Sequence, residues 1–442
     1  MTMPLVSIED VPIQKFHQRL TISAAGGIFV DGYVLSVIGV IILHATTVLQ
    51  LSDFWQGMIA ASSLIGIFAG GLIGGWLTSS LGRKRLFYAS PLIFLVASIG
   101  QFYADSAAML FFWRIIIGIG VGIEYPAATA MLAEFLPRKN RGPRLAALST
   151  CWFAGAAAAY IFGEIILRTG GDEAWRLVLA SGAVLGGALF AMRLGTPESL
   201  RWLLSKGRKE EAAVLVKKIY GSDFSIANIG EDTNTIRLPL KSILSAGYGK
   251  RMFFVVTFWT CAMLPVFAVY AFAPKVLSAL KLDDDAGSIG SIAITLFFVV
   301  GCVVATKLIN TLGRRNVMIY SFLLAGISLM GLAGFQSSSS YLVILFFSCY
   351  ALFIGGAQVL TFVYPNEIFP TEIRSFAVGV GTSFSRIGAA IGTYLVPVSL
   401  NSLGVSITML VAAGITFIGL IVAILLAPET RSLNLHEASA LA

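Results

Sequence analysis

The chain has 442 residues, of which 57% are hydrophobic and 12% are charged, and its formal net charge is +8. A soluble domain carries about 25% charged residues, so this composition excludes an ordinary soluble protein. The basic excess is not gathered into one exposed basic domain, which also excludes a nucleic-acid-binding protein.

Apolar runs of about 20 residues recur along the chain, and this is the length that a helix needs to cross a bilayer. Helices are required because hydrocarbon offers the backbone no hydrogen-bond partners. The sequence therefore predicts an all-α integral membrane protein with twelve spans, which are 20–46, 54–78, 85–104, 107–133, 145–168, 175–195, 252–275, 287–309, 316–335, 341–364, 375–400 and 405–427. The first run is too long for the core of a signal peptide. The four cysteines lie in apolar runs and show neither metal-binding nor disulfide spacing.

The largest non-apolar stretch separates the sixth and seventh spans. Within it, residues 201–221 combine helix formers with charges of both signs, which predicts one or two amphipathic surface helices. We therefore expect an N-terminal six-helix half (1–196), a cytoplasmic linker (197–250), and a C-terminal six-helix half with a short tail (251–442).

The basic residues orient the chain in the membrane. With both termini in the cytoplasm, 25 of the 31 Lys and Arg residues lie on the cytoplasmic side, four lie on the opposite side and two lie within spans. This asymmetry is what the positive-inside rule predicts. The sequence thus predicts a multi-pass protein of the inner (cytoplasmic) membrane, and we expect it to be a monomer.

Three short patterns occur once in each half, at offsets of 231, 233 and 231 residues. The pairs are LGRKR (81–85) with LGRRN (312–316), EFLPRKNR (134–141) with EIFPTEIR (367–374), and PES (197–199) with PET (428–430). Three pairs at nearly one offset indicate a duplicated six-helix unit with parallel repeats. In such folds the substrate site lies between the repeats, near the middle of the bilayer.

Together with Arg114 and the glycines at 118, 120 and 122, these motifs resemble the major facilitator superfamily, in particular its sugar-porter and organic-ion branch. The resemblance covers essentially the whole chain and includes PESLRWLLSKGR (197–208) and PETRS (428–432). The Asp-Gly-Tyr-Val-Leu segment at 31–35 is similar to bacterial inner-membrane metabolite transport proteins. The resemblance implies a major facilitator fold with two six-helix bundles related by a pseudo-two-fold axis, and alternating access between them.

The resemblance also implies a charged network that holds the cytoplasmic side shut. Its candidate members are Arg83, Lys84, Glu134, Arg141, Glu198, Arg314, Arg315, Glu367, Arg374 and Glu429. The loops could instead be basic turns that only satisfy topology. The family usually has an Asp three residues before the loop glycine, where this chain has Ser79 and Asn310. Either the network depends on the glutamates or it is weaker than usual.

Charged residues inside a span cost about 2.5–3.5 kcal/mol on insertion scales, so each is a functional candidate. Asp31, Arg114, Glu124, Glu164 and Arg386 fall in this class. We expect Asp31 and Arg114 to couple transport to protons, as the resembling symporters use a first-helix Asp and a fourth-helix Arg. A substrate competing for the arginine would let the carboxylate bind a proton. Glu124 could take a second proton. A buried ion pair that only locks helices together is the alternative, and Glu164 could simply reach water.

Arg386 bears on the substrate, because an arginine in a wet central cavity attracts carboxylate or phosphate through its fork of donors. The alternative is a packing arginine paired with an acid such as Glu124. Further candidate substrate-binding residues are Tyr33, Trp152, Trp259, Tyr270, Gln358 and Tyr364, each of which could equally be a packing residue.

No nucleotide-binding loop, nucleophile motif or His/Cys cluster is present in the sequence, so we expect no enzyme activity, no cofactor and no metal. The expected partners are a small-molecule substrate, protons and the lipid bilayer. The first hypothesis is proton-coupled transport of a small organic anion, such as an aromatic, dicarboxylic or sugar acid. A neutral sugar or polyol is the alternative, although 258–275 lacks the hexose-binding run of sugar porters. Efflux, a transporter-like sensor and a channel complete the alternatives.

Overall fold

The computed structural model describes residues 7–171, 173–229, 248–279, 284–335, 340–369 and 371–431. This part of the chain contains twelve long α-helices, which are α1 (Lys15–Val48), α2 (Asp53–Leu81), α3 (Arg83–Phe102), α4 (Ala107–Phe135), α5 (Arg138–Thr169), α6 (Ala174–Arg193), α10 (Gly249–Ala279), α11 (Asp284–Thr311), α12 (Arg314–Gly334), α13 (Ser340–Ile368), α14 (Thr371–Ser402) and α15 (Gly404–Leu426). Several begin at hydroxyl caps: Ser52 accepts from the Trp55 amide and Ser106 from the Met109 amide. The predicted all-helical membrane fold is confirmed.

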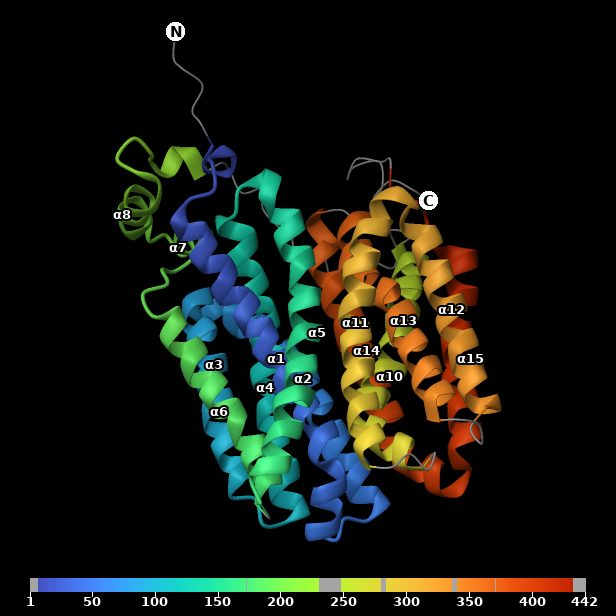
Figure 1. Ribbon diagram of the computed structural model, residues 1–442. Helices are drawn as coiled ribbons and strands as arrows, with labels where there is room; N and C mark the ends of the chain where they lie inside the picture. The colour runs from blue at the N-terminus through green and yellow to red at the C-terminus, as the bar shows by residue number, and fades with distance from the viewer. Residues whose placement is uncertain are drawn as a thin grey trace.

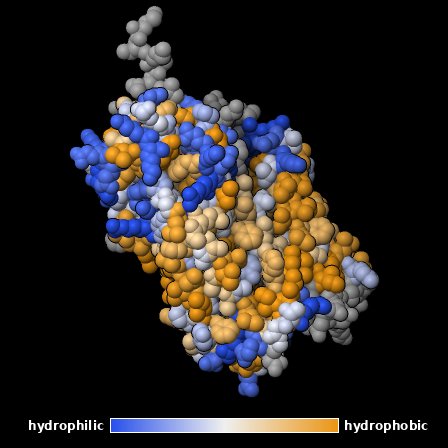
Figure 2. Space-filling model, turned by 60° about the vertical axis from the view of Figure 1, so that its left-hand side comes forward, coloured by the Kyte–Doolittle hydropathy of each residue, from blue (hydrophilic) through white to orange (hydrophobic). Residues whose placement is uncertain are grey.

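Eleven of these helices are long and apolar enough to cross a bilayer. Only α14 does not meet that criterion within the described residues, because small and hydroxyl residues alternate along it and Arg386 interrupts its apolar centre. Figure 2 shows a broad hydrophobic band across this face of the molecule, between two hydrophilic ends. Side chains such as Val184 and Leu425, which are 73% and 72% exposed, face outward and fit contact with lipid.

The six helices α1–α6 and the six helices α10–α15 form two bundles that stand side by side (Figure 1). The same neighbours recur in each bundle: the second helix packs on the fourth, the first on the fifth, and the third on the sixth. Across the boundary, α2 packs on α14 and α5 packs on α11. The duplicated motifs of the sequence thus correspond to a duplicated packing pattern.

Between the bundles in the chain lie two short surface helices, α7 (Leu200–Ser205) and α8 (Lys209–Tyr220), and the 3₁₀ turn η2 (Ile226–Ile229). Ala212, Val216 and Tyr220 form the buried face of α8, and its charged residues are exposed. Helix α1 begins at the end of the molecule that carries α7 and α8 (Figure 1), preceded by the 3₁₀ turn η1 (Ile8–Asp10). Following the distribution of basic residues, we call this the cytoplasmic end and the other the periplasmic end.

The periplasmic ends of the two bundles are in direct contact. The Asn401 side-chain amide on α14 donates to the Asp53 carboxylate on α2 over 2.6 Å. One turn further into α2, Gly57 lies so close to α14 that an added Cβ would stand 2.4 Å from the Tyr394 carbonyl oxygen. Phe54 packs edge-on against the Tyr394 ring, with 6.2 Å between centroids. The periplasmic side of the boundary between α2 and α14 is therefore closed in this conformation.

Candidate functional site

The boundary between the bundles holds two buried ionisable side chains of opposite sign, neither of which forms an ion pair among the described contacts. Asp31 on α1 is fully buried, and neither of its carboxylate oxygens accepts a hydrogen bond. Arg386 on α14 is 3% exposed, and its Nε and Nη1 atoms have no acceptor. The Arg386 guanidinium lies against the Tyr125 hydroxyl of α4 and within electrostatic reach of Asp31. The structure thus brings together two residues that we expected to serve different steps.

The ring of Phe267, on α10, covers the Arg386 guanidinium at 5.3 Å from the ring centroid. Such a contact stabilises a cation by about 0.5–2 kcal/mol, which is less than the several kcal/mol that burying an ion costs. Phe267 therefore orients Arg386 without neutralising it. The Arg386 side chain remains available for an anionic partner.

Arg114, which we expected to pair with Asp31, binds backbone carbonyl oxygens of α1 instead. It is 1% exposed and donates to the carbonyl oxygens of Val34 and Leu35 on α1, over 3.5 and 3.3 Å. These carbonyls lie one helical turn toward the periplasmic end from Asp31, and the structure records no ion pair between Asp31 and Arg114 among the described contacts. The expected carboxylate–arginine pair is therefore not bonded in this conformation, because the Arg114 guanidinium binds backbone carbonyls one turn away from Asp31.

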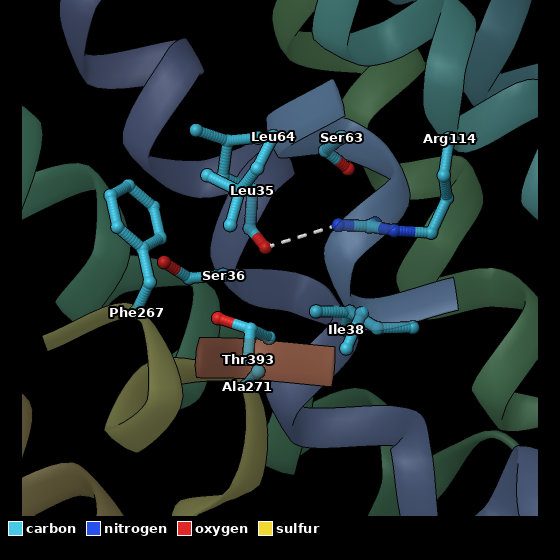
Figure 3. A pocket seen from close by; sticks show the side chains of 10 residues that line it. Leu35, Ser36, Ile38, Ser63, Leu64, Arg114, Phe267, Ala271 and Thr393 are labelled. Atoms are coloured by element: carbon cyan, nitrogen blue, oxygen red, sulfur yellow. Dashed lines mark hydrogen bonds between the residues drawn. The ribbon is translucent and has the colours of Figure 1, made fainter. Parts of the chain in front are cut away.

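Arg114 lines a small pocket at the bundle boundary, with room for about one water molecule (Figure 3). Residues of α1, α2, α4, α10 and α14 surround it. Three hydroxyls of the lining, those of Ser36, Ser63 and Thr393, are buried without a hydrogen-bond partner. Unsatisfied polar groups are rare in protein interiors, and each calls for an explanation. Here they lie where two bundles meet.

Glu124 does not face a free cavity. Its carboxylate forms a two-pronged ion pair with Arg193 on α6, in which Nη1 donates to Oε2 over 2.7 Å and Nη2 donates to Oε1. Both side chains are fully buried. Glu124 is consequently bonded to Arg193 and not to Arg386.

Arg193 was not among the candidate residues predicted from the sequence. It stands near the end of the predicted span 175–195, where a basic residue is explained by the positive-inside rule alone. Its position inside that span was the signal available in the sequence. Glu164 instead pairs with Arg168 on the same helix, over 2.7 Å, near the periplasmic end of α5.

The expected aromatic and amide residues are only partly gathered at the boundary. Trp152 packs edge-on against Phe267 across the bundles, with 5.7 Å between centroids. Trp259 is buried on α10 and its indole N–H has no acceptor. Tyr33 hydrogen-bonds to Ser181 over 2.7 Å within one bundle. Gln358 donates to the Ala262 carbonyl over 2.8 Å, also within one bundle.

Two members of that set are placed differently. Tyr364 lies at the cytoplasmic end of α13 and donates to the Pro428 carbonyl over 2.9 Å. It therefore supports a cytoplasmic network rather than the central site. The side chain of Tyr270 lies outside the described residues.

The cytoplasmic network of the first bundle joins the start of α3 to the end of α4 and the start of α7. Arg83 pairs with Glu134 over 2.9 Å. The Glu198 carboxylate accepts from the backbone amides of Arg83 and Lys84 over 2.9 and 3.0 Å, capping α3. The Ser199 hydroxyl donates to Glu134, which links the start of α7 to the end of α4. Lys84 contributes only its backbone, and its side chain is exposed.

The second bundle repeats the arrangement. Arg314 pairs with Glu367 over 2.9 Å, and Glu429 accepts from the backbone amides of Arg314 and Arg315 over 3.0 and 3.1 Å. Thr430 donates to Glu367 over 2.5 Å, as Ser199 does to Glu134. The glutamates thus bind both loop arginines where the usual loop aspartates are replaced. The side chains of Arg141 and Arg374 lie outside the described residues.

Gly313 should not tolerate a side chain. Its φ is +89°, and an added Cβ would stand 2.4 Å from the Glu429 carboxylate. With ψ at 163°, this backbone conformation is adopted essentially by glycine alone and costs another residue about 1–3 kcal/mol, and the clash would also disturb the cap of α12. We expect Gly313→Ala to lower the melting temperature of the purified protein. Gly334→Ala, on the same helix with open space around its Cβ position, is the matched control and should leave it nearly unchanged. Equal melting temperatures for both variants would contradict the role of this turn.

The described residues contain no group of three or more His, Cys, Asp and Glu side chains placed to hold a metal ion. The four cysteines are free.

The family model, the related sequences and the solved structures that match this chain are all membrane transporters. The family model "Sugar (and other) transporter" matches residues 20–442. The inner membrane metabolite transport protein YgcS of Escherichia coli K12 is 36% identical over 433 residues, which cover 98% of this chain and 96% of that protein. The arabinose–proton symporter of Bacillus subtilis 168 is 26% identical over 449 residues, covering 97% and 96%. The xylose transporter XylE of E. coli, in a partially occluded inward-open conformation, aligns with a TM-score of 0.82 at 20% identity, covering 95% of this chain and 100% of that chain.

Proposed function

Because this chain belongs to the sugar transporter family of the major facilitator superfamily, and is a multi-pass membrane transporter of metabolites rather than an enzyme, we propose that it moves a small organic anion by proton-coupled alternating access. The anion we propose is a carboxylate or a sugar acid. As its relative YgcS is named an inner membrane protein, we place this transport in the inner membrane.

The observation that carries the proposal is the unpaired guanidinium of Arg386. Burying an ion costs several kcal/mol unless an opposite charge and hydrogen bonds compensate it. Arg386 is buried at the boundary of the bundles with Nε and Nη1 unbonded. A carboxylate can accept a hydrogen bond from either of these unbonded donors, and with Nη2 as the second donor it can accept two parallel hydrogen bonds. The substrate anion is the partner that this arrangement favours.

The proton acceptor we propose is Asp31. Its carboxylate is fully buried with no donor to either oxygen, so its charged form is not compensated by hydrogen bonds. It interacts with Arg386 across the bundle boundary. A substrate anion that binds Arg386 would remove the nearest compensating charge across that boundary, and Asp31 would then favour its neutral, protonated form. Substrate and proton would thus bind together.

Alternating access follows from the position of these residues. Asp31 belongs to one bundle and Arg386 to the other, so a ligand held between them links the two bundles. Once substrate and proton have neutralised both charges, the bundles can pivot about the loaded site at a lower electrostatic cost. Opening on the other side would release the cargo.

A second candidate substrate is a neutral sugar or polyol. The buried hydroxyls of Ser36, Ser63 and Thr393 are unbonded at the same boundary, and they would suit a ligand rich in hydroxyls. One relative carries the name arabinose–proton symporter. On this reading, Arg386 would hydrogen-bond a sugar hydroxyl or hold a structural position.

A thermal-shift screen of the purified protein separates the two candidates. The panel should contain aromatic, dicarboxylic and sugar acids, neutral sugars, polyols and organic cations. We expect a carboxylate to raise the melting temperature, because a ligand that binds only the folded state stabilises it. The shift should disappear in Arg386→Ala. Stabilisation by neutral sugars alone, retained in Arg386→Ala, would instead favour the sugar-porter alternative.

A further inference from the structure

The ion pair between Glu124 and Arg193 is the centre of a buried polar cluster inside the first bundle. Besides its two bonds to Glu124, the Arg193 guanidinium donates to the Phe87 carbonyl over 2.6 Å and to the Ser90 hydroxyl over 3.2 Å. It also lies over the Phe87 ring, 3.6 Å from the centroid. Ser90 in turn donates to Glu124. Both oxygens of the Glu124 carboxylate are therefore engaged as acceptors.

The cluster is enclosed by helix α1. A Cβ at Gly27 would stand 2.0 Å from a Glu124 oxygen and 2.2 Å from an Arg193 nitrogen, so only glycine allows α1 to pass so closely. Arg193 also donates to the Ser23 carbonyl of α1 over 3.4 Å. Glu124 is thus held by α6 and shielded by α1. A carboxylate that accepts several charge-assisted bonds strongly favours its ionised form.

Asp31 lies one turn along α1 from Gly27 and, unlike Glu124, accepts no hydrogen bond. The charged groups that act on Asp31 come from three helices of both bundles: Glu124 on α4, Arg193 on α6 and Arg386 on α14. The Tyr125 hydroxyl of α4 interacts with the same group. Neither of its oxygens has a donor. Two buried carboxylates that influence each other thus differ completely in bonding.

We infer that Arg193 is a positioning residue: its two-pronged pair holds Glu124 as a fixed anion beside Asp31, so that Asp31 alone binds the transported proton. Like charges close together cannot both stay ionised at low cost. The pair removes Glu124 from that competition. Glu124 is therefore no second proton carrier, contrary to what the sequence suggested. This inference deepens the proposed function and rests on its proton coupling.

Infrared spectroscopy tests the inference without knowledge of the substrate. Protein reconstituted in lipid is titrated with acid on an attenuated-total-reflection cell, and the C=O stretching band of a protonated, buried carboxyl is followed. We expect one such band in the wild type. It should be lost in Asp31→Asn and retained in the double variant Glu124→Gln/Arg193→Gln. The double variant removes both charges together and so leaves no unpaired ion in the core.

The single variants make the positioning role visible. In Arg193→Gln, Glu124 loses its counter-charge and should show a second carboxyl band. Arg193→Lys keeps a cation at this place and should restore the single band of the wild type. Arg168→Gln breaks the pair with Glu164 at the periplasmic end of α5 and is the matched control, with no expected change. If Arg193 served folding alone, we would not expect a second carboxyl band that appears in Arg193→Gln and is absent in Arg193→Lys.

Three results would overturn the inference. The first is a wild-type band that survives in Asp31→Asn and vanishes in the double variant, because Glu124 would then be the proton acceptor. The second is the absence of a titrating band in the wild type. The third is an Arg193→Gln spectrum identical to the wild type. None of these depends on whether an anion or a sugar is transported, so a failed substrate proposal remains distinguishable from a failed inference.

Discussion

Replacing Arg386 by alanine is expected to abolish binding and transport of the organic anion while leaving the protein folded. The guanidinium would give the carboxylate about two charge-assisted hydrogen bonds, each of about 1.5–3 kcal/mol, so affinity should fall by at least about 100-fold. The variant should be at least as stable as the wild type without ligand, because it removes a buried cation whose Nε and Nη1 are unbonded. The measurement is uptake into proteoliposomes of the acid identified in the thermal screen, together with its dissociation constant.

Arg386→Lys and Arg168→Ala are the controls for this experiment. Lysine retains the charge but not the planar fork of donors, so binding should weaken without disappearing. Arg168 lies half-exposed near the periplasmic end of α5, and its loss should change neither uptake nor affinity. Normal transport by Arg386→Ala would remove the anion hypothesis.

In Asp31→Asn, a proton gradient should no longer drive accumulation, although the protein should still exchange substrate across the membrane. Asparagine resembles a permanently protonated aspartate, so the loaded site can switch but cannot release a proton. With one proton per substrate, each pH unit supports about tenfold accumulation, since one unit corresponds to about 1.36 kcal/mol. The accumulation ratio should therefore fall to about one. Proteoliposomes with an imposed pH difference measure accumulation, and preloaded vesicles measure exchange.

Glu164→Gln is the matched control, because it neutralises a carboxylate on α5 that already has a partner near the surface. Its accumulation and exchange should match the wild type. If Asp31→Asn loses both exchange and accumulation, Asp31 has a structural role and the coupling must reside elsewhere.

The membrane architecture could be predicted because the bilayer imposes it: span length and the distribution of basic residues follow from the hydrocarbon core. The cytoplasmic networks could be anticipated as well, since each member occurs twice at one offset. The structure adds the individual hydrogen bonds, such as those by which Glu198 and Glu429 cap α3 and α12. Backbone caps of this kind leave no pattern beyond the glutamate itself.

The central pairings could not be predicted from the sequence. A span that is apolar on nearly every side gives little indication of its rotation, so the partner of a buried charge stays open. Arg114 therefore seemed close enough to Asp31 to pair with it, whereas one helical turn separates Asp31 from the carbonyls that Arg114 binds. Arg193 stands near the end of the predicted span 175–195, where a basic residue would be expected to face the cytoplasm, whereas α6 carries it into the core beside Glu124.

The ion pairs described above have a consequence for how salt acts on transport. Arg83–Glu134 and Arg314–Glu367 each lie within one bundle. The bundles themselves meet at the periplasmic end through a hydrogen bond, aromatic edges and the backbone approach at Gly57, and at the centre through the buried Arg386 beside Tyr125 and Asp31. Pivoting of the bundles would break none of these ion pairs. Exposed charges are screened over about 8 Å at physiological ionic strength. The rate at which the loaded carrier reorients should accordingly be almost independent of salt concentration, so salt that slows transport would do so by competing for the central arginine.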